Sequence, residues 1–260
     1  MTSEPGFVDI RGVRLRMRRA GRGPVVLYLH GFDGAAPAGG TVERLAKECD
    51  VLLPDHLGMG ESDTPPWLET IHDLAYFYLD LLRALDLRAV HLVGHDIGGW
   101  IALETAIRSL ERVSSLTLIG SAGIHVNGVP KGDLFMRAPE AVLRSLFADP
   151  AIADAVLARK PTRAEEDILI KNRHTIARVG WHPPLFDPHL AKWLHRVAVP
   201  ALIVWGDTDR LFPLDYAHEF ARLLPDARMT VLPQCGHAAH IEKPDAVAAA
   251  VAAFVKEHAR

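Results

Sequence analysis

Short hydrophobic runs alternate with longer amphipathic segments along most of the chain. The short runs have the length and composition of strands, whereas the longer segments repeat their apolar residues at helical spacing. Strands are expected at 7–10, 13–18, 25–30, 49–54, 89–94, 113–120, 201–206 and 229–233, and helices at 41–48, 72–86, 100–110, 215–224 and 245–258. Apolar strands that alternate with helices are typical of parallel sheets covered on both faces. The pattern therefore predicts an α/β protein with a mostly parallel, eight-stranded sheet.

One interval breaks this alternation. Residues 122–192 contain helical patterns at 138–147, 150–160 and 165–179 but no convincing strand. We interpret the interval as an inserted helical lid, with residues 1–121 and 193–260 forming the core domain. A third helical layer with no role in access is the alternative interpretation.

Composition and charge indicate which kinds of molecule the protein binds. The chain has 260 residues, 49% of them hydrophobic, and its 29 basic and 32 acidic residues are scattered to a net charge of −3. Such a chain can form one domain with a large core, and it offers no basic surface for nucleic acid or an anionic membrane. No apolar stretch approaches ~18 residues, so no membrane span is expected. We expect a small apolar organic substrate as partner, and either a monomer or a homodimer.

The two cysteines indicate the cellular compartment. Cys49 and Cys235 lie far apart and lack metal-ligand spacing, which is typical of reduced thiols. The first twelve residues, MTSEPGFVDIRG, contain no apolar signal core. We therefore expect a cytoplasmic protein.

The stretch VHLVGHDIGGW at 90–100 carries the first candidate for chemistry. A strand-like run meets a turn flanked by Gly94 and Gly98, and a helix-like run follows. Small residues in this pattern allow a sharp strand-to-helix turn whose apex side chain stands above the sheet at a helix N-terminus. The apex residue is Asp96, and aspartate tolerates the left-handed backbone that this turn requires.

Three further signals follow in a fixed order. Phe32, in LYLHGFDG, and Ile97 can supply two backbone N–H groups as an oxyanion hole. Asp209, in VWGDTDRLFP, and His237, in LPQCGHAAH, each follow a predicted strand. With these motifs and the turn PDHLGMGES at 54–62, the chain resembles the α/β-hydrolase family over nearly its whole length. The resemblance implies Asp96, Asp209 and His237 as the catalytic residues.

Several assignments have competitors. Asp207 competes with Asp209, although the family's G-x-x-D-x-x-x-P spacing favours Asp209. His240 competes with His237, but it should already lie on the closing helix. Cys235 is interpreted as a small loop filler. Further candidates for the substrate pocket are His30, His95, Trp100, His125, His174 and Trp181.

An aspartate at the apex favours attack on a saturated carbon. Its carboxylate is ionised at neutral pH, and the helix N-terminus and two amide groups should keep it so. Asp96 would displace a leaving group and form an alkyl ester. His237, oriented by Asp209, would then activate the water that hydrolyses this ester.

Within the family, an apex aspartate resembles epoxide hydrolases and dehalogenases. Epoxide hydrolases generally use lid tyrosines, but the four tyrosines here, Tyr28, Tyr76, Tyr78 and Tyr216, lie outside 122–192. His125, His174 or His182 would then be the lid acid. Haloalkane dehalogenases usually hold halide with a tryptophan directly after the nucleophile, and Ile97 occupies that place. Trp181 could instead donate its indole N–H to a leaving group.

Other segments resemble a different branch. GSAGIHVNG, KNR at 171–173 and FDPHLAKWLHRVAVPALIVWG are similar to serine esterases and carbon–carbon hydrolases, which carry serine at the apex. Asp96 would then be a natural change of nucleophile, a substitution that disabled an esterase, or a base acting on water. A small-molecule receptor is a third functional class. No nucleotide fingerprint or metal-ligand cluster is recognisable, so no cofactor or metal is expected.

Overall fold

Eight strands form a single sheet at the centre of the protein, in a computed structural model that describes residues 6–259. Their order across the sheet is β1-β2-β4-β3-β5-β6-β7-β8. The strands are β1 (Gly6–Ile10), β2 (Val13–Gly21), β3 (Val25–Leu29), β4 (Asp50–Pro54), β5 (Val90–His95), β6 (Val113–Ile119), β7 (Ala201–Gly206) and β8 (Ala227–Leu232). Strand β2 pairs antiparallel with β1 and β4, and the other pairs are parallel. The predicted α/β class and mostly parallel sheet are confirmed.

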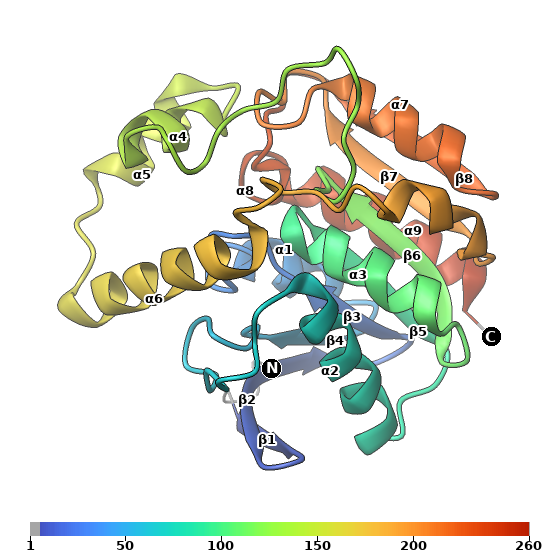
Figure 1. Cartoon of the computed structure of the whole chain (residues 1–260). Helices are drawn as coiled ribbons and strands as arrows, with labels where there is room; N and C mark the ends of the chain where they lie inside the picture. The colour runs from blue at the N-terminus through green and yellow to red at the C-terminus, as the bar shows by residue number, and fades with distance from the viewer. Residues whose placement is uncertain (1–5, 260) are drawn as a thin grey trace.

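Helices cover both faces of this sheet (Figure 1). On one face lie α2 (Ile71–Ala84), α3 (Ile97–Arg108), the 3-10 helix η1 (Leu190–Arg196) and α7 (Leu214–Leu223). On the other lie α1 (Gly39–Leu45), α8 (Ala239–Glu242) and α9 (Pro244–His258). Each face has its own cluster of buried hydrophobic side chains, which is why the central strands are apolar on both sides.

Helix α2 shows how the sequence pattern produces an element. It begins with a capping box in which Thr70 and Asp73 satisfy each other's backbone N–H groups. Its buried residues, Ile71, Leu74, Ala75, Phe77, Tyr78, Leu81 and Leu82, mostly repeat every three or four positions. This stripe packs on α3, because removing apolar surface from water stabilises the contact.

The interval predicted as a lid contains α4 (Pro139–Ser145), α5 (Pro150–Ala158) and α6 (Arg163–Gly180). These helices lie together to one side of the sheet and its covering helices (Figure 1). Within residues 122–192, all of them described, no strand of the sheet occurs. The predicted boundary at residue 192 falls inside η1, whose Leu190 and Leu194 are buried with the core. A lid function for this segment stays a prediction.

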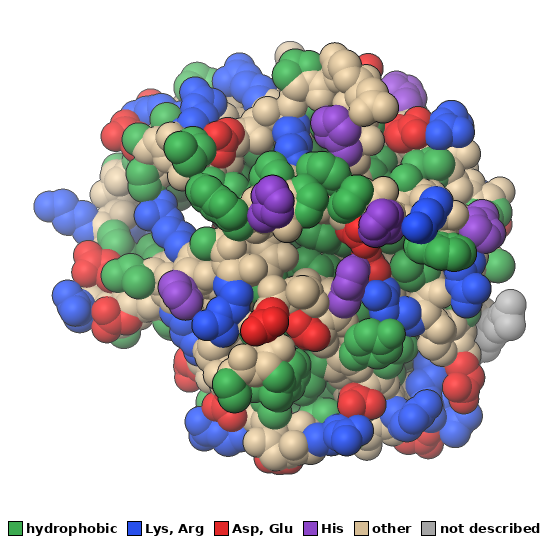
Figure 2. Space-filling view, in the orientation of Figure 1, with side chains coloured by type: hydrophobic (Ala, Val, Ile, Leu, Met, Phe, Trp, Pro, Cys, Tyr) green, Lys and Arg blue, Asp and Glu red, His purple; other side chains and the backbone are tan. Residues whose placement is uncertain are grey.

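Hydrophobic side chains gather near the middle of one face, where the chain returns from α6 toward β7, and charged side chains surround them (Figure 2). None of the helices within residues 6–259 has the length and apolar character needed to cross a membrane.

Candidate active site

The turn between β5 and α3 holds Asp96 in an unusual conformation. Its backbone has φ 52° and ψ −120°, and its side chain is buried. A Cβ atom at Gly98 would lie only 2.0 Å from the carbonyl oxygen of Leu29, and one at Gly94 would lie 2.4 Å from the carbonyl oxygen of Gly98. Only glycine fits at either place, so the flanking residues force the apex side chain to stand above the sheet.

The Asp96 carboxylate has one occupied and one free oxygen. Its Oδ2 accepts a hydrogen bond from the backbone N–H of Phe32 at 3.0 Å, and the backbone N–H of Ile97 also stabilises the charged carboxylate. Its Oδ1 has no hydrogen-bond partner and lies 3.7 Å from His237 Nε2, which has no partner either. The predicted pair of amide groups therefore converges on the carboxylate itself, and the free oxygen faces the imidazole.

Burial shifts the pKa of Asp96. Desolvation raises the pKa of this carboxyl to about 6, against the opposing effects of His237 and of the two amide groups. The sequence predicts an ionised carboxylate at neutral pH, and a pKa of about 6 agrees with that prediction, although burial moves the pKa upward. At pH 7 a group with this pKa is still ionised in about nine molecules of ten.

His237 is oriented by Asp209. Its Nδ1–H donates to Asp209 Oδ2 at 2.9 Å, which leaves Nε2 toward Asp96. The other oxygen, Asp209 Oδ1, accepts from the backbone N–H of Leu211 and Phe212. Burial lowers the pKa of His237, but the Asp209 and Asp96 carboxylates outweigh it, and the net shift is upward. The free nitrogen can therefore accept a proton from a nearby water.

The competing residues lie elsewhere. Asp207 Oδ1 accepts from the backbone N–H of Cys235 and so fastens the loop before His237. His240 lies on α8 and donates to Asp33 at 3.1 Å. Cys235 is buried, and desolvation raises the pKa of its thiol to about 12, as expected of a residue that only fills space in the loop.

The six additional pocket candidates do not converge on one place. His30 and His95 are buried, and His95 Nε2 donates to the His237 carbonyl oxygen at 3.2 Å. Trp100 is buried and donates to Glu104. His125 and His174 are exposed, whereas Trp181 lines a pocket. Their roles in binding substrate stay predictions.

A pocket of about 350 Å³ is lined in part by Phe32, whose backbone N–H donates to Asp96 and whose ring centre lies 6.5 Å from that of His237. Its wall comes largely from the segment predicted as a lid. The lining residues are Phe32, Leu134, Phe135, Arg137, Pro139, Val142, Arg173, Ile176, Ala177 and Trp181. Asp96 and His237 themselves are buried and are not among the residues that line this pocket.

One connection was not anticipated from the sequence. Glu242 Oε2 accepts from the backbone N–H of Gly236, and its Oε1 accepts from the N–H groups of Ala148 and Asp149. The loop that carries His237 is therefore tied directly to the segment between α4 and α5. Local spacing does not predict the contact with residues 148 and 149, because Glu242 is 94 and 93 residues away from them.

Two groups of side chains in the described part of the chain have the composition of metal ligands. In one, His240 donates to Asp33 and His95 donates to the His237 carbonyl. In the other, His72 lies within 3.1 Å of Asp187 and 3.5 Å of Glu104. Both groups are explained by these contacts. The expectation that neither metal nor cofactor takes part stays a prediction.

Comparison with known proteins places these features in context. A family model described as the alpha/beta hydrolase family matches residues 26–250. A 2-hydroxy-6-oxo-6-(2'-aminophenyl)hexa-2,4-dienoic acid hydrolase from Metapseudomonas resinovorans is 29% identical over 97% of this chain and 91% of its own.

Two solved structures extend the comparison. A serine hydrolase involved in carbazole degradation superimposes with a TM-score of 0.80 at 26% identity, covering 99% of this chain and 100% of its own. A meta-cleavage product hydrolase from Pseudomonas fluorescens IP01 gives a TM-score of 0.82 at 24% identity, covering 97% of each chain. At that identity the second structure supports the fold alone.

Proposed function

Because the chain belongs to the alpha/beta hydrolase family, we propose that it is a hydrolase whose nucleophile is Asp96, attacking a saturated carbon to form an alkyl ester. The single observation that supports this most is the state of the carboxylate. Oδ2 accepts from the N–H of Phe32, the N–H of Ile97 also stabilises the charged carboxylate, and Oδ1 has no hydrogen-bond partner and lies 3.7 Å from His237 Nε2. An ionised oxygen in that position attacks without first losing a proton.

In the first step, Oδ1 of Asp96 forms a bond to the substrate carbon. The bond between that carbon and the leaving group breaks, and its electron pair departs with the leaving group. Oδ2 keeps its hydrogen bond from the N–H of Phe32 and becomes the carbonyl oxygen of the new ester. His237 takes no part in this step.

In the second step, His237 Nε2 removes a proton from water, and the water oxygen attacks Cγ of Asp96. Negative charge then develops on Oδ2, which already accepts from the N–H of Phe32. This N–H group, with that of Ile97 as the second donor, stabilises the tetrahedral intermediate. Collapse breaks the ester bond, and the alcohol product receives the proton from His237. The carboxyl group formed in this way gives its remaining proton to solvent or to the anionic leaving group, which restores the carboxylate.

The same geometry disfavours attack on an ester or ketone carbonyl by Asp96. The carbonyl oxygen of such a substrate needs the two amide groups, but the Asp96 carboxylate already interacts with both of them. Attack would also give an anhydride, which readily reverts. An epoxide or an alkyl halide has no such requirement.

The pocket narrows the substrate further. Its wall is mainly apolar, with donor groups from Arg137, Arg173 and the indole of Trp181. These donors can stabilise a departing halide or oxygen anion. We therefore propose a small organic epoxide or halide that is bound between the core and a lid formed by residues 122–192.

The decisive experiment uses His237→Ala. The variant should still be alkylated but should not hydrolyse the ester, so intact-protein mass spectrometry should detect a covalent adduct with a reactive epoxide or haloalkane. The control His237→Ala/Asp96→Asn should give no adduct. If the wild type consumes a compound but the mass of His237→Ala never increases by that of the transferred alkyl group, Asp96 is not the nucleophile.

The relatives favour a second candidate. The curated relative above is named a 2-hydroxy-6-oxo-6-(2'-aminophenyl)hexa-2,4-dienoic acid hydrolase, and one of the solved structures is named a serine hydrolase. The chain would then be an ester or carbon–carbon hydrolase in which aspartate replaces serine. Under this candidate, Asp96→Ser should gain turnover of p-nitrophenyl esters that the wild type lacks. An inert Asp96→Ser variant that retains the fold, measured by circular dichroism, would argue against it.

A further inference from the structure

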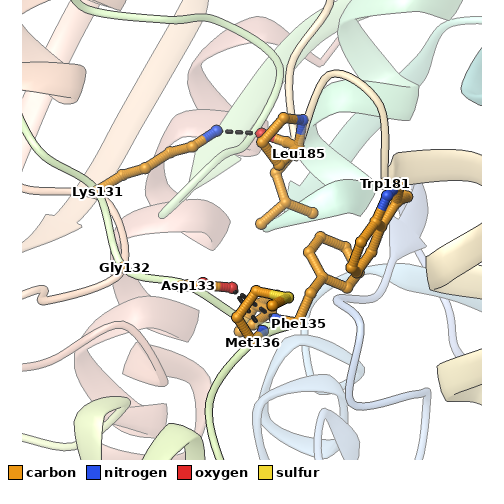
Figure 3. A pocket seen from close by; sticks show the side chains of 9 residues that line it. Lys131, Gly132, Asp133, Phe135, Met136, Trp181 and Leu185 are labelled. Atoms are coloured by element: carbon orange, nitrogen blue, oxygen red, sulfur yellow. Dashed lines mark hydrogen bonds between the residues drawn. The ribbon is translucent and has the colours of Figure 1, made fainter.

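A second pocket lies beside the one that reaches Phe32. It encloses about 360 Å³ between residues 131–136 and residues 181–185. The two pockets share Leu134, Phe135 and Trp181 as common walls. Figure 3 shows Lys131 extending across the second pocket, with Trp181 and Phe135 on the far side. The two pockets therefore adjoin each other, and both are lined mainly by residues of the predicted lid, 122–192. We call them the two chambers.

Lys131 is the one cationic side chain that lines the second pocket. Its Nζ donates to the carbonyl oxygen of Pro184 and lies 4.8 Å from the centre of the Phe186 ring. Among residues 6–259 these are its only contacts of this kind. An ammonium group has three N–H donors, so two remain available to a ligand.

The acidic residue of this pocket, Asp133, partly offsets the charge of the ammonium from a distance, but in the described part of the chain it forms no ion pair with Lys131. Asp133 Oδ1 accepts from the backbone N–H of Phe135, at 2.7 Å, and of Met136, at 3.0 Å. Burial lowers the pKa of Lys131 to about 8, so the group is still mostly charged at neutral pH. A partly buried cation without an ion-pair partner is stabilised by an anion that enters the same space.

We propose that this chamber binds the distal end of the substrate, and that Lys131 pairs with a carboxylate there. The substrate class is then an extended molecule whose reactive carbon lies near Asp96, whose apolar body passes Phe135 and Trp181, and whose far end is anionic. The assignment of this ligand as substrate rests on the proposed function. Carboxylate binding by Lys131 does not.

Calorimetric titration of the full chain tests the proposal, with 6-phenylhexanoate and the neutral 6-phenylhexan-1-ol as probes. Lys131→Met keeps the apolar stem but removes the charge. It should weaken binding of the acid by about tenfold or more and change binding of the alcohol by less than about twofold. Lys131→Arg should retain acid binding. Lys160→Met, an exposed lysine of the same segment, is the matched control and should leave both affinities unchanged.

Three results would overturn the proposal. The acid and the alcohol could lose affinity equally in Lys131→Met, or wild type could bind neither probe. Alternatively, the acid could bind Arg137 or Arg173 in the neighbouring chamber, in which case Lys131→Met would leave its affinity unchanged. Since no turnover is measured, each outcome is independent of whether Asp96 forms an alkyl ester.

Discussion

Replacing Asp209 with asparagine should separate the two chemical steps. The variant loses the charged partner of His237 Nδ1, now 2.9 Å away and shielded from solvent. A hydrogen bond to a charged group contributes about 1.5–3 kcal/mol. At 1.36 kcal/mol per unit, its loss lowers the pKa of His237 by about 1–2 units. Asparagine can also donate to Nδ1, which favours the tautomer whose Nε2 carries a proton and cannot act as a base.

The two steps should respond differently. Alkylation does not use His237, so a rapid-quench experiment should still show a first turnover of leaving group. Hydrolysis of the ester should slow by about 10²–10⁴-fold. Because the base must be neutral, the remaining hydrolysis should rise at lower pH than in the wild type, by about the same 1–2 units.

Asp207→Asn is the matched control, because Asp207 contacts the backbone N–H of Cys235 and not the imidazole. It should leave the pH profile unmoved. If Asp209→Asn reduced the first turnover and the steady state equally, or if its profile coincided with that of wild type, the assigned roles of His237 and Asp209 would be wrong.

Three further predictions concern the framework of the site. Glu242→Gln removes the negative charge of the carboxylate that accepts from three backbone N–H groups. It should lower the free energy of unfolding in urea by about 1–3 kcal/mol. Hydrogen exchange of the backbone amides at residues 146–149 should become faster. Gly98→Ala places a Cβ against backbone and should lower the stability measured by thermal denaturation by about 1–3 kcal/mol or more. Gly6→Ala, with open space around it, should be nearly neutral. Cys49 and Cys235 are buried and burial raises the pKa of both thiols, so the native protein should resist iodoacetamide at neutral pH until urea exposes them.

The arrangement of strands and helices could be read from the sequence because it follows from local periodicity. The stripe in α2 and the apolar central strands each require a particular face to be buried, whatever lies opposite. The turn at Asp96 was equally readable, since Gly94 and Gly98 leave room that any other residue would fill. The chain order of Asp96, Asp209 and His237 then followed from the motifs around them.

Only the tertiary structure decided the properties that depend on distant neighbours. The upward shift in the pKa of Asp96 comes from desolvation by the whole fold, and the sequence pattern predicted no such shift. The contact of Glu242 with residues 148–149 and the position of Lys131 beside Trp181 join segments far apart in the chain. Local spacing carries no information about such pairs, because side chains meet there only after the sheet and its covering helices have packed.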